Sequence, residues 1–202
     1  MDQLSLSYIM KLNHIFPQTI GIAQYPDADH DAMRIAKHMN GTKPFIYNPH
    51  HDTLIQDLMQ WIDVEVNQYA KAMQYPDRYY CTESWLHDYR LNTYQPWHSH
   101  AGNTISAVYI VIAKPETSTP LYFRNPVNDM MNPMNANMDP DYEPPNPKWY
   151  NSEQMAYPSN HGTLYIFRSY LEHSIALKDN TDRRIALALN YNKTKRVGLF
   201  RQ

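Results

Sequence analysis

The chain has 202 residues and a mass of 23.8 kDa, which suits one domain that buries roughly 70% of the surface of its unfolded chain. Its 18 Lys and Arg against 20 Asp and Glu give a net charge of −2, which excludes the basic surface typical of proteins that bind nucleic acids or anionic membranes. A single cysteine, Cys81, and five dispersed glycines exclude a disulfide framework, a cysteine-rich metal site, a P-loop and a Rossmann fingerprint.

The N-terminal part of the chain predicts two helices and no targeting segment. The first twenty residues lack a basic stretch followed by an apolar run, and the longest apolar run, 107–113, is far shorter than the about 20 residues of a membrane span. Apolar residues recur every three positions between 29 and 39, and at helical spacing from 52 or 53 to 73. We therefore expect residues 1–75 to form a helical support region. The lone cysteine favours a cytoplasmic location.

After residue 75 the pattern changes to short segments rich in aromatic and β-branched residues. They cover residues 84–94, 104–113, 121–124, 163–168 and 184–192. Short strands at these intervals predict a mainly β fold, a jelly roll over residues 76–202, in one domain with the helices. Segment 125–160, rich in Pro, Asn and Met and free of glycine, interrupts the strands. We expect it to be a lid or a substrate-binding loop, since long irregular loops in compact domains are usually functional or disordered.

The densest chemical signal is the histidine pair in Trp97-His98-Ser99-His100. Two histidines at i and i+2 of an extended segment lie on the same face, so both imidazoles can converge on one ion. A third histidine, His173, follows the strand predicted at 163–168. Histidines that only pack or lie on the surface are the alternative interpretation of such a pattern.

The last predicted strand carries an arginine on a face of small residues. Arg184, Ala186, Ala188 and Asn190 share one face of this strand, and the opposite face is apolar. An inward-facing arginine next to alanines leaves room for a carboxylate, which its planar guanidinium can bind with two hydrogen bonds. The alternative is that this face of the strand is exposed to solvent.

Three blocks of the sequence together resemble the iron(II)- and 2-oxoglutarate-dependent oxygenases. The blocks are YQPWHSHAGNTISAVYIV, HGTLYIFRSYLEHSIALKDNTDRRIALALN and, near the start, IFPQTIGI. The signature of these enzymes is H-x-D/E, a long insertion, a distal histidine, and an Arg or Lys about ten residues later. The chain is most similar to a family of such oxygenases, related to the prolyl hydroxylases, that carries H-x-H instead.

This resemblance implies a double-stranded β-helix fold and an enzyme that uses Fe(II), 2-oxoglutarate and O₂. It would hydroxylate an unidentified small molecule or protein side chain and release succinate and CO₂. His98, His100 and His173 would hold the iron, with His100 at the position where the wider superfamily has a carboxylate. Three neutral imidazoles would make the complex one unit more positive than the usual two-histidine, one-carboxylate site.

The resemblance also implies a binding site for 2-oxoglutarate at Arg184, with the adjacent Arg183 as an alternative. Many members of the superfamily add a tyrosine or another polar side chain to this contact. The candidates for that second residue are Tyr109, Ser106, Asn92 and Tyr94.

Two other functions remain open at this stage. A cupin-like metalloenzyme could use three histidines without 2-oxoglutarate, and a salt bridge between Arg184 and a carboxylate such as Asp182 would favour it. A non-catalytic jelly-roll binding module is the other alternative, and failure to bind iron would favour it. The sequence identifies neither the substrate nor the oligomeric state, and a homodimer remains an option.

Overall fold

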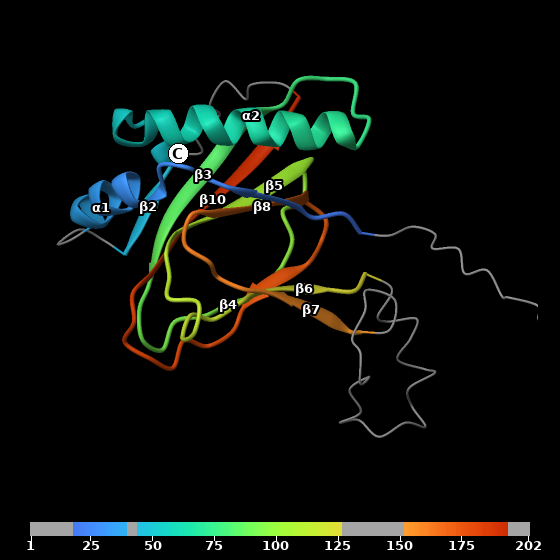
Figure 1. Cartoon of the computed structure of the whole chain (residues 1–202). Helices are drawn as coiled ribbons and strands as arrows, with labels where there is room; N and C mark the ends of the chain where they lie inside the picture. Colours follow the sequence, from blue (N-terminus) through green and yellow to red (C-terminus); the bar gives the residue numbers. More distant parts are fainter. Residues whose placement is uncertain (1–17, 40–43, 127–151, 194–202) are drawn as a thin grey trace, which may run out of the picture.

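Two antiparallel sheets lie face to face in the computed structural model, which describes residues 18–39, 44–126 and 152–193 (Figure 1). The larger sheet has the order β1 (Gly21–Gln24), β8 (Thr163–Arg168), β5 (Ile105–Ile112), β10 (Arg184–Asn192), β3 (Tyr80–Tyr89) and β2 (Phe45–Tyr47). The smaller sheet has the order β4 (Gln95–His98), β9 (His173–Ile175), β6 (Leu121–Arg124) and β7 (Gln154–Tyr157). The predicted mainly β, double-stranded β-helix fold is confirmed.

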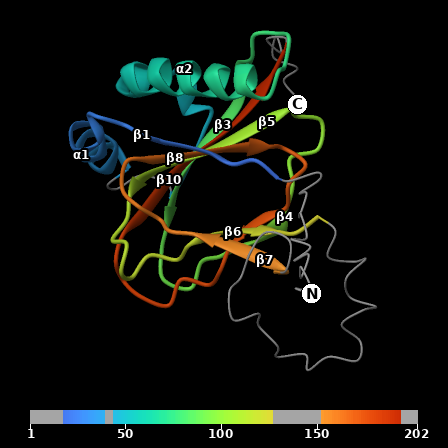
Figure 2. The same cartoon turned by 45° about the vertical axis from the view of Figure 1, so that its right-hand side comes forward.

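Both helices cover the outer face of the larger sheet, away from the smaller one (Figures 1 and 2). They are α1 (Ala28–Met39) and α2 (Gln56–Ala72), and the short 3₁₀ turns η1 (Pro49–His51) and η2 (Thr53–Ile55) precede α2. Leu58, Ile62 and Val66 are fully buried at four-residue spacing and form the stripe of α2 that packs on the sheet. Asp52 accepts a hydrogen bond from the backbone N–H of Leu54 at 2.8 Å, so the helical segment begins at the position where the apolar spacing predicted its start.

Strand β10 separates two apolar cores. Ile185, Leu187 and Leu189 belong to the core beneath the helices, whereas Ala186 and Ala188 belong to the core between the two sheets. The alternation predicted for residues 184–190 is therefore confirmed. It gives the space between the sheets a lining of small side chains along β10.

Several short strands were not predicted. β1 and β2 extend the larger sheet at its two edges, so the region expected to be a helical support also contributes strands. β7 lies within the predicted loop 125–160, of which residues 127–151 are outside the described part of the chain. β4 and β9 complete the smaller sheet. Strands of three or four residues are too short to show a period of two, and they form because longer neighbours provide hydrogen-bonding partners.

The predicted strand at 84–94 begins earlier and ends earlier than expected. β3 ends at Tyr89, and Asn92 has a φ of 63°, which turns the chain toward β4. In the described segments, no helix has both the length and the hydropathy that crossing a membrane requires.

Candidate active site

Three imidazoles meet on the smaller sheet. His98, the last residue of β4, lies opposite His173, the first residue of β9, in the antiparallel register. His100 follows two residues after His98. The potential ligand atoms of the three side chains all lie within 4.8 Å of one another. This is the convergence that the i, i+2 spacing and the distal histidine predicted.

The other ring nitrogens of two of these histidines are fixed by backbone carbonyls. His98 Nδ1 donates to the carbonyl oxygen of Pro96 at 2.8 Å, and His173 Nδ1 donates to that of Leu171 at 3.0 Å. A neutral imidazole has one ring proton, so both Nε2 atoms carry a lone pair, and the Nε2 of His173 lies 3.2 Å from that of His100. Such outer hydrogen bonds are typical of metal-ligating histidines, because they fix both tautomer and ring orientation.

Burial keeps two of the imidazoles neutral. Burial first, and neighbouring histidines second, lower the pKa of His173 to about 3 and that of His100 to about 4. A metal ion requires the unprotonated nitrogen, so at neutral pH neither ring must lose a proton before binding.

Aromatic rings surround the cluster. The ring of Phe167 lies 4.8 Å from that of His173, and the ring of Trp85 lies 5.3 Å from that of His100. Trp97 lies beneath the guanidinium of Arg124, at 5.0 Å, and that guanidinium pairs with Glu172 at 3.1 Å. Glu172, next to His173 in sequence, is therefore bound elsewhere. Among the described residues, the cluster contains no carboxylate.

Arg184 is a buried charged side chain between the two sheets. It is 1% exposed, and within the described part of the chain its Nη1 and Nη2 atoms have no hydrogen-bond partner. Its Nε donates to Ser159 Oγ at 3.3 Å, and its guanidinium carbon lies 4.5 Å from the centroid of the Tyr89 ring. Burial lowers the pKa of the guanidinium and raises that of Tyr89. A buried guanidinium whose two Nη atoms make no hydrogen bond at normal distance to the described residues, with the Tyr89 hydroxyl close to it, is expected of a site for an anion.

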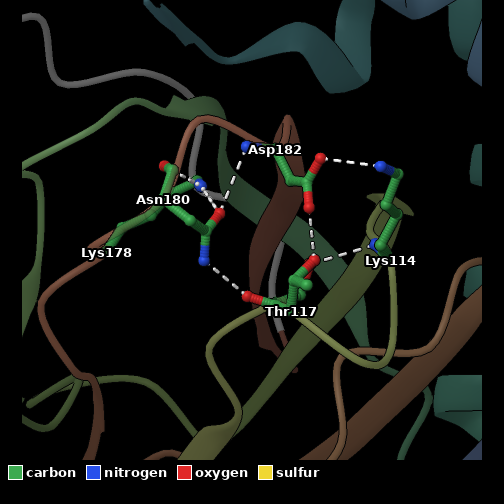
Figure 3. Close-up of polar contacts among 6 residues, drawn as sticks. Lys114, Thr117, Lys178, Asn180 and Asp182 are labelled. Atoms are coloured by element: carbon green, nitrogen blue, oxygen red, sulfur yellow. Dashed lines mark hydrogen bonds and ion pairs between the residues drawn. The ribbon is translucent and has the colours of Figure 1, made fainter.

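The carboxylates near Arg184 in sequence bind other partners. Asp182 accepts from Lys114 Nζ at 2.8 Å and from Thr117 Oγ1 at 2.5 Å (Figure 3). Lys178 and Asn180 extend this network, which ties the segment before β10 to the turn after β5 (Figure 3). Arg183 pairs with Asp88 at 3.1 Å, on the side of the helices. Of the two adjacent arginines, Arg184 is therefore the one that faces the space between the sheets.

A family model identifies the class of protein. Residues 83–190, more than half of the chain, match the model of the family described as "Putative 2OG-Fe(II) oxygenase". The chain belongs to this family. It is therefore an oxygenase that depends on Fe(II) and 2-oxoglutarate, as the sequence resemblance implied.

Solved structures share the fold of this oxygenase at low identity. EctD from S. alaskensis, with 2-oxoglutarate and 5-hydroxyectoine, has a TM-score of 0.63 and 12% identity over 87% of this chain and 72% of its own. HygX from Streptomyces hygroscopicus, with iron bound, has a TM-score of 0.58 and 9% identity over 88% of this chain and 83% of its own. SnoN, the non-heme α-ketoglutarate-dependent epimerase from nogalamycin biosynthesis, has a TM-score of 0.62 and 9% identity over 87% of this chain and 78% of its own. No curated protein sequence matches the chain.

The structure distinguishes among the residues predicted to make a second polar contact with 2-oxoglutarate in the oxygenase. Ser106 is buried, and its hydroxyl lies 2.8 Å from both Ser169 Oγ and Asn190 Oδ1, so it is part of the network behind His100. Tyr109 was predicted wrongly, because it points to the helix-side core, where its ring contacts those of Tyr25 and Trp61.

The remaining candidates, Asn92 and Tyr94, were also predicted wrongly. Both are exposed in the turn between β3 and β4, outside the space between the sheets. This turn forms because Asn92 adopts a left-handed conformation, and the sequence pattern, which extended the strand through Tyr94, did not show it.

The sequence pattern does not single out three residues that contact Arg184 or Asn190. Ser159 orients Arg184, and Tyr89 lies opposite it in the register of β3 and β10. Glu83, on β3, accepts a hydrogen bond from Asn190 at 3.2 Å. Only Asn190 left a signal in the sequence, through its place on the same strand face as Arg184. The other contacts depend on strand pairing.

Proposed function

We propose that this oxygenase holds Fe(II) with His98, His100 and His173, binds 2-oxoglutarate through Arg184, and hydroxylates a C–H bond of its substrate. Succinate and CO₂ would be the products of the co-substrate. The observation that carries the proposal is Arg184, a buried guanidinium with two unpaired Nη atoms, in the same space between the sheets that the three imidazoles face.

The three histidines fit a divalent transition metal. Imidazole is a ligand that suits iron, and His98 and His173 each present an Nε2 lone pair fixed by a carbonyl behind the ring. Three protein ligands leave coordination positions for the 2-oxo acid and O₂. His100 would supply a neutral metal ligand at the position where related oxygenases usually have a carboxylate.

The space next to Arg184 fits a dicarboxylate. Ala186 and Ala188 are the only side chains of β10 between Arg184 and Asn190 on this face, and Ala188 is partly exposed. One carboxylate of 2-oxoglutarate would accept hydrogen bonds from the Nη atoms of Arg184, and Ser159 holds that side chain through its Nε. The 2-oxo acid end would then extend toward the histidines.

O₂ would be the oxidant at the bound iron, with one oxygen atom going into succinate as 2-oxoglutarate loses CO₂ and the other into the substrate hydroxyl; the protein supplies orientation and a dry site. Arg184 fixes one end of the co-substrate, and the three imidazoles fix the position of the metal. Phe123 and Phe167 pack against His173, and Trp85 packs against His100, so aromatic rings line this side of the proposed metal ligands. We propose that the substrate, a small molecule or a protein side chain, enters beside Trp97.

Three further properties belong to this proposal. We expect residues 1–202 to act as one domain, and a reducing, cytoplasmic location suits the single cysteine, Cys81. We propose a homodimer as the assembly state of the oxygenase.

An anaerobic titration tests the function directly. Metal-free protein would be titrated with Fe(II) and then with 2-oxoglutarate, while the visible absorption band of the chelated complex is followed. The band is expected to appear only after both additions. Iron binding without any effect of 2-oxoglutarate would favour the three-histidine, cupin-like enzyme, and no iron binding would leave a jelly-roll binding module.

A further inference from the structure

A buried amide connects Glu83 to the histidine cluster. Asn190 is 2% exposed, and its Nδ2 lies 3.2 Å from Glu83 Oε2 and 3.3 Å from His100 Nδ1. Its Oδ1 accepts from Ser106 Oγ at 2.8 Å. Both protons of the amide are therefore used, one toward the carboxylate and one toward the imidazole.

Glu83 determines which way this amide faces. A carboxylate only accepts hydrogen bonds, so the NH₂ group of Asn190, not its carbonyl, must face Glu83. The second N–H of the same group then points at His100 Nδ1, which must be the acceptor. Ser106 does not fix the amide, because a hydroxyl can donate or accept.

The tautomer of His100 follows from this contact. A neutral imidazole whose Nδ1 accepts carries its proton on Nε2. His100 Nε2 lies 3.2 Å from His173 Nε2, which must accept because His173 Nδ1 donates to a carbonyl. In the series of hydrogen bonds from Glu83 through Asn190 and His100 to His173, every donor therefore faces an acceptor. This series leaves His100 without a lone pair on Nε2.

We propose that Glu83 is a positioning residue that, acting through Asn190, holds His100 in the tautomer that cannot ligate a metal with Nε2. This inference rests on the proposed metal site. His98 Nε2 is free to bind, whereas His173 Nε2 accepts from His100 and His100 has no lone pair on Nε2, so these two join only when the amide of Asn190 turns over and presents Oδ1 to Nδ1–H of His100. Glu83 opposes this turn, because it would bring two oxygens together. Glu83 therefore weakens metal binding.

The variant Glu83→Gln tests the inference by the sign of its effect. Its side-chain amide can donate to Oδ1 of the turned Asn190, so the ligating tautomer of His100 becomes stable. We expect the affinity for Co(II), followed by calorimetry on metal-free protein, to rise about tenfold, a size typical of changes in the outer hydrogen bonds of metal sites. A purely electrostatic role predicts the opposite, since removing a negative charge near a cation weakens binding.

Glu172→Gln is the matched control. Glu172 adjoins His173 in sequence but pairs with Arg124, outside the Asn190 network. This variant is expected to bind Co(II) no more tightly than the unchanged protein. A rise equal to that of Glu83→Gln would overturn the proposal, as would unchanged or weaker binding by folded Glu83→Gln protein.

Long-range ¹⁵N–¹H NMR of the imidazoles in metal-free protein supplies a readout that does not involve the metal. We expect His100 to be protonated at Nε2 in the unchanged protein and at Nδ1 in Glu83→Gln. A protonated Nδ1 in the unchanged protein would overturn the proposal even if Co(II) binds. If the unchanged protein binds no metal, the proposed function fails, while the NMR result still decides what Glu83 does.

A second variant keeps the test decisive if Glu83→Gln does not fold. Asn190→Ala removes the donor to His100 Nδ1 and frees the choice of tautomer. We expect its Co(II) affinity to rise. A fall in folded protein, by contrast, would show that Asn190 supports the ligating geometry, and the proposal would be wrong.

Discussion

Arg184 carries a charge that the described neighbours do not balance, and this determines how its variants should behave. In Arg184→Gln, we expect the affinity for 2-oxoglutarate to fall about 100-fold, because charge-assisted hydrogen bonds to its carboxylate are lost. Iron binding should change little, since the histidines lie on the other sheet. Isothermal titration with each ligand, under anaerobic conditions, measures both effects.

The neighbouring arginine is the control for this experiment. Arg183→Gln removes the same charge one residue away but breaks only the pair with Asp88. Its affinity for 2-oxoglutarate should stay within about twofold. A similar loss in both variants would contradict the role assigned to Arg184.

The free energy of unfolding gives a second prediction for Arg184. A buried charge without hydrogen-bond partners destabilises the fold, so Arg184→Leu is expected to make the ligand-free protein at least as stable as the unchanged one. Urea unfolding without 2-oxoglutarate measures this. A loss of several kcal/mol would mean that the guanidinium is stabilised by the fold and is not held for a ligand.

His173 is the ligand whose loss should be least tolerated. His173→Ala is expected to abolish iron binding, since it removes the Nε2 held by the carbonyl of Leu171. The fold should survive with a loss of about 1–3 kcal/mol, because the vacated space lies against Phe167. Iron titration and circular dichroism check both statements. His87→Ala, a histidine outside the cluster, should keep iron binding, and an aggregated His173→Ala protein would point to a purely structural role.

Among the elements, β10 connects the two functions of the site. Its inward face carries Arg184 at one end and Asn190 at the other, with two alanines between them. Ala188→Leu should fill this space and prevent 2-oxoglutarate from binding, while iron still binds. Ala188→Ser adds little volume and should bind 2-oxoglutarate nearly normally. Equal affinities of the two variants for 2-oxoglutarate would show that the co-substrate lies elsewhere.

The long elements could be predicted from sequence because each has its own periodic pattern. α2 buries one face and shows that face in its residue order, and β10, although buried on both faces, alternates large apolar residues with small or polar ones. The failed prediction for Tyr109 has the opposite cause. β5 is buried on both faces, so its residues are almost all apolar and the alternation does not reveal which side chains face the site.

The histidine site was also predictable, but its supporting contacts were not. The i, i+2 spacing placed His98 and His100 together, since it depends only on the period of a strand. Glu83 and Ser159 reach the site through pairing between β3 and β10 and through the chain beyond β7, which involve residues 107 and 25 positions apart. No local pattern carries such information.

At the scale of the whole molecule, buried neutral histidines predict how stability depends on pH. The pKa of His173 is lowered to about 3, and those of His100 and His50 to about 4, chiefly by burial. In the unfolded chain these groups titrate near 6.5. Between about pH 6.5 and pH 4 the unfolded state therefore binds more protons, and the free energy of unfolding must fall as the pH falls.

The size of this effect can be measured on metal-free protein. One such group contributes about 1.4 kcal/mol per pH unit once it is fully protonated in the unfolded chain only. Urea unfolding at pH 7, 6 and 5 should show a loss that steepens below pH 6. The variant His50→Gln, outside the metal cluster, should make this dependence shallower, because one proton-binding group is removed from the unfolded state. A free energy of unfolding that stays constant from pH 7 to pH 5 would show that these imidazoles are accessible to protons in the folded protein. That result would contradict the burial on which the neutral ligand set depends.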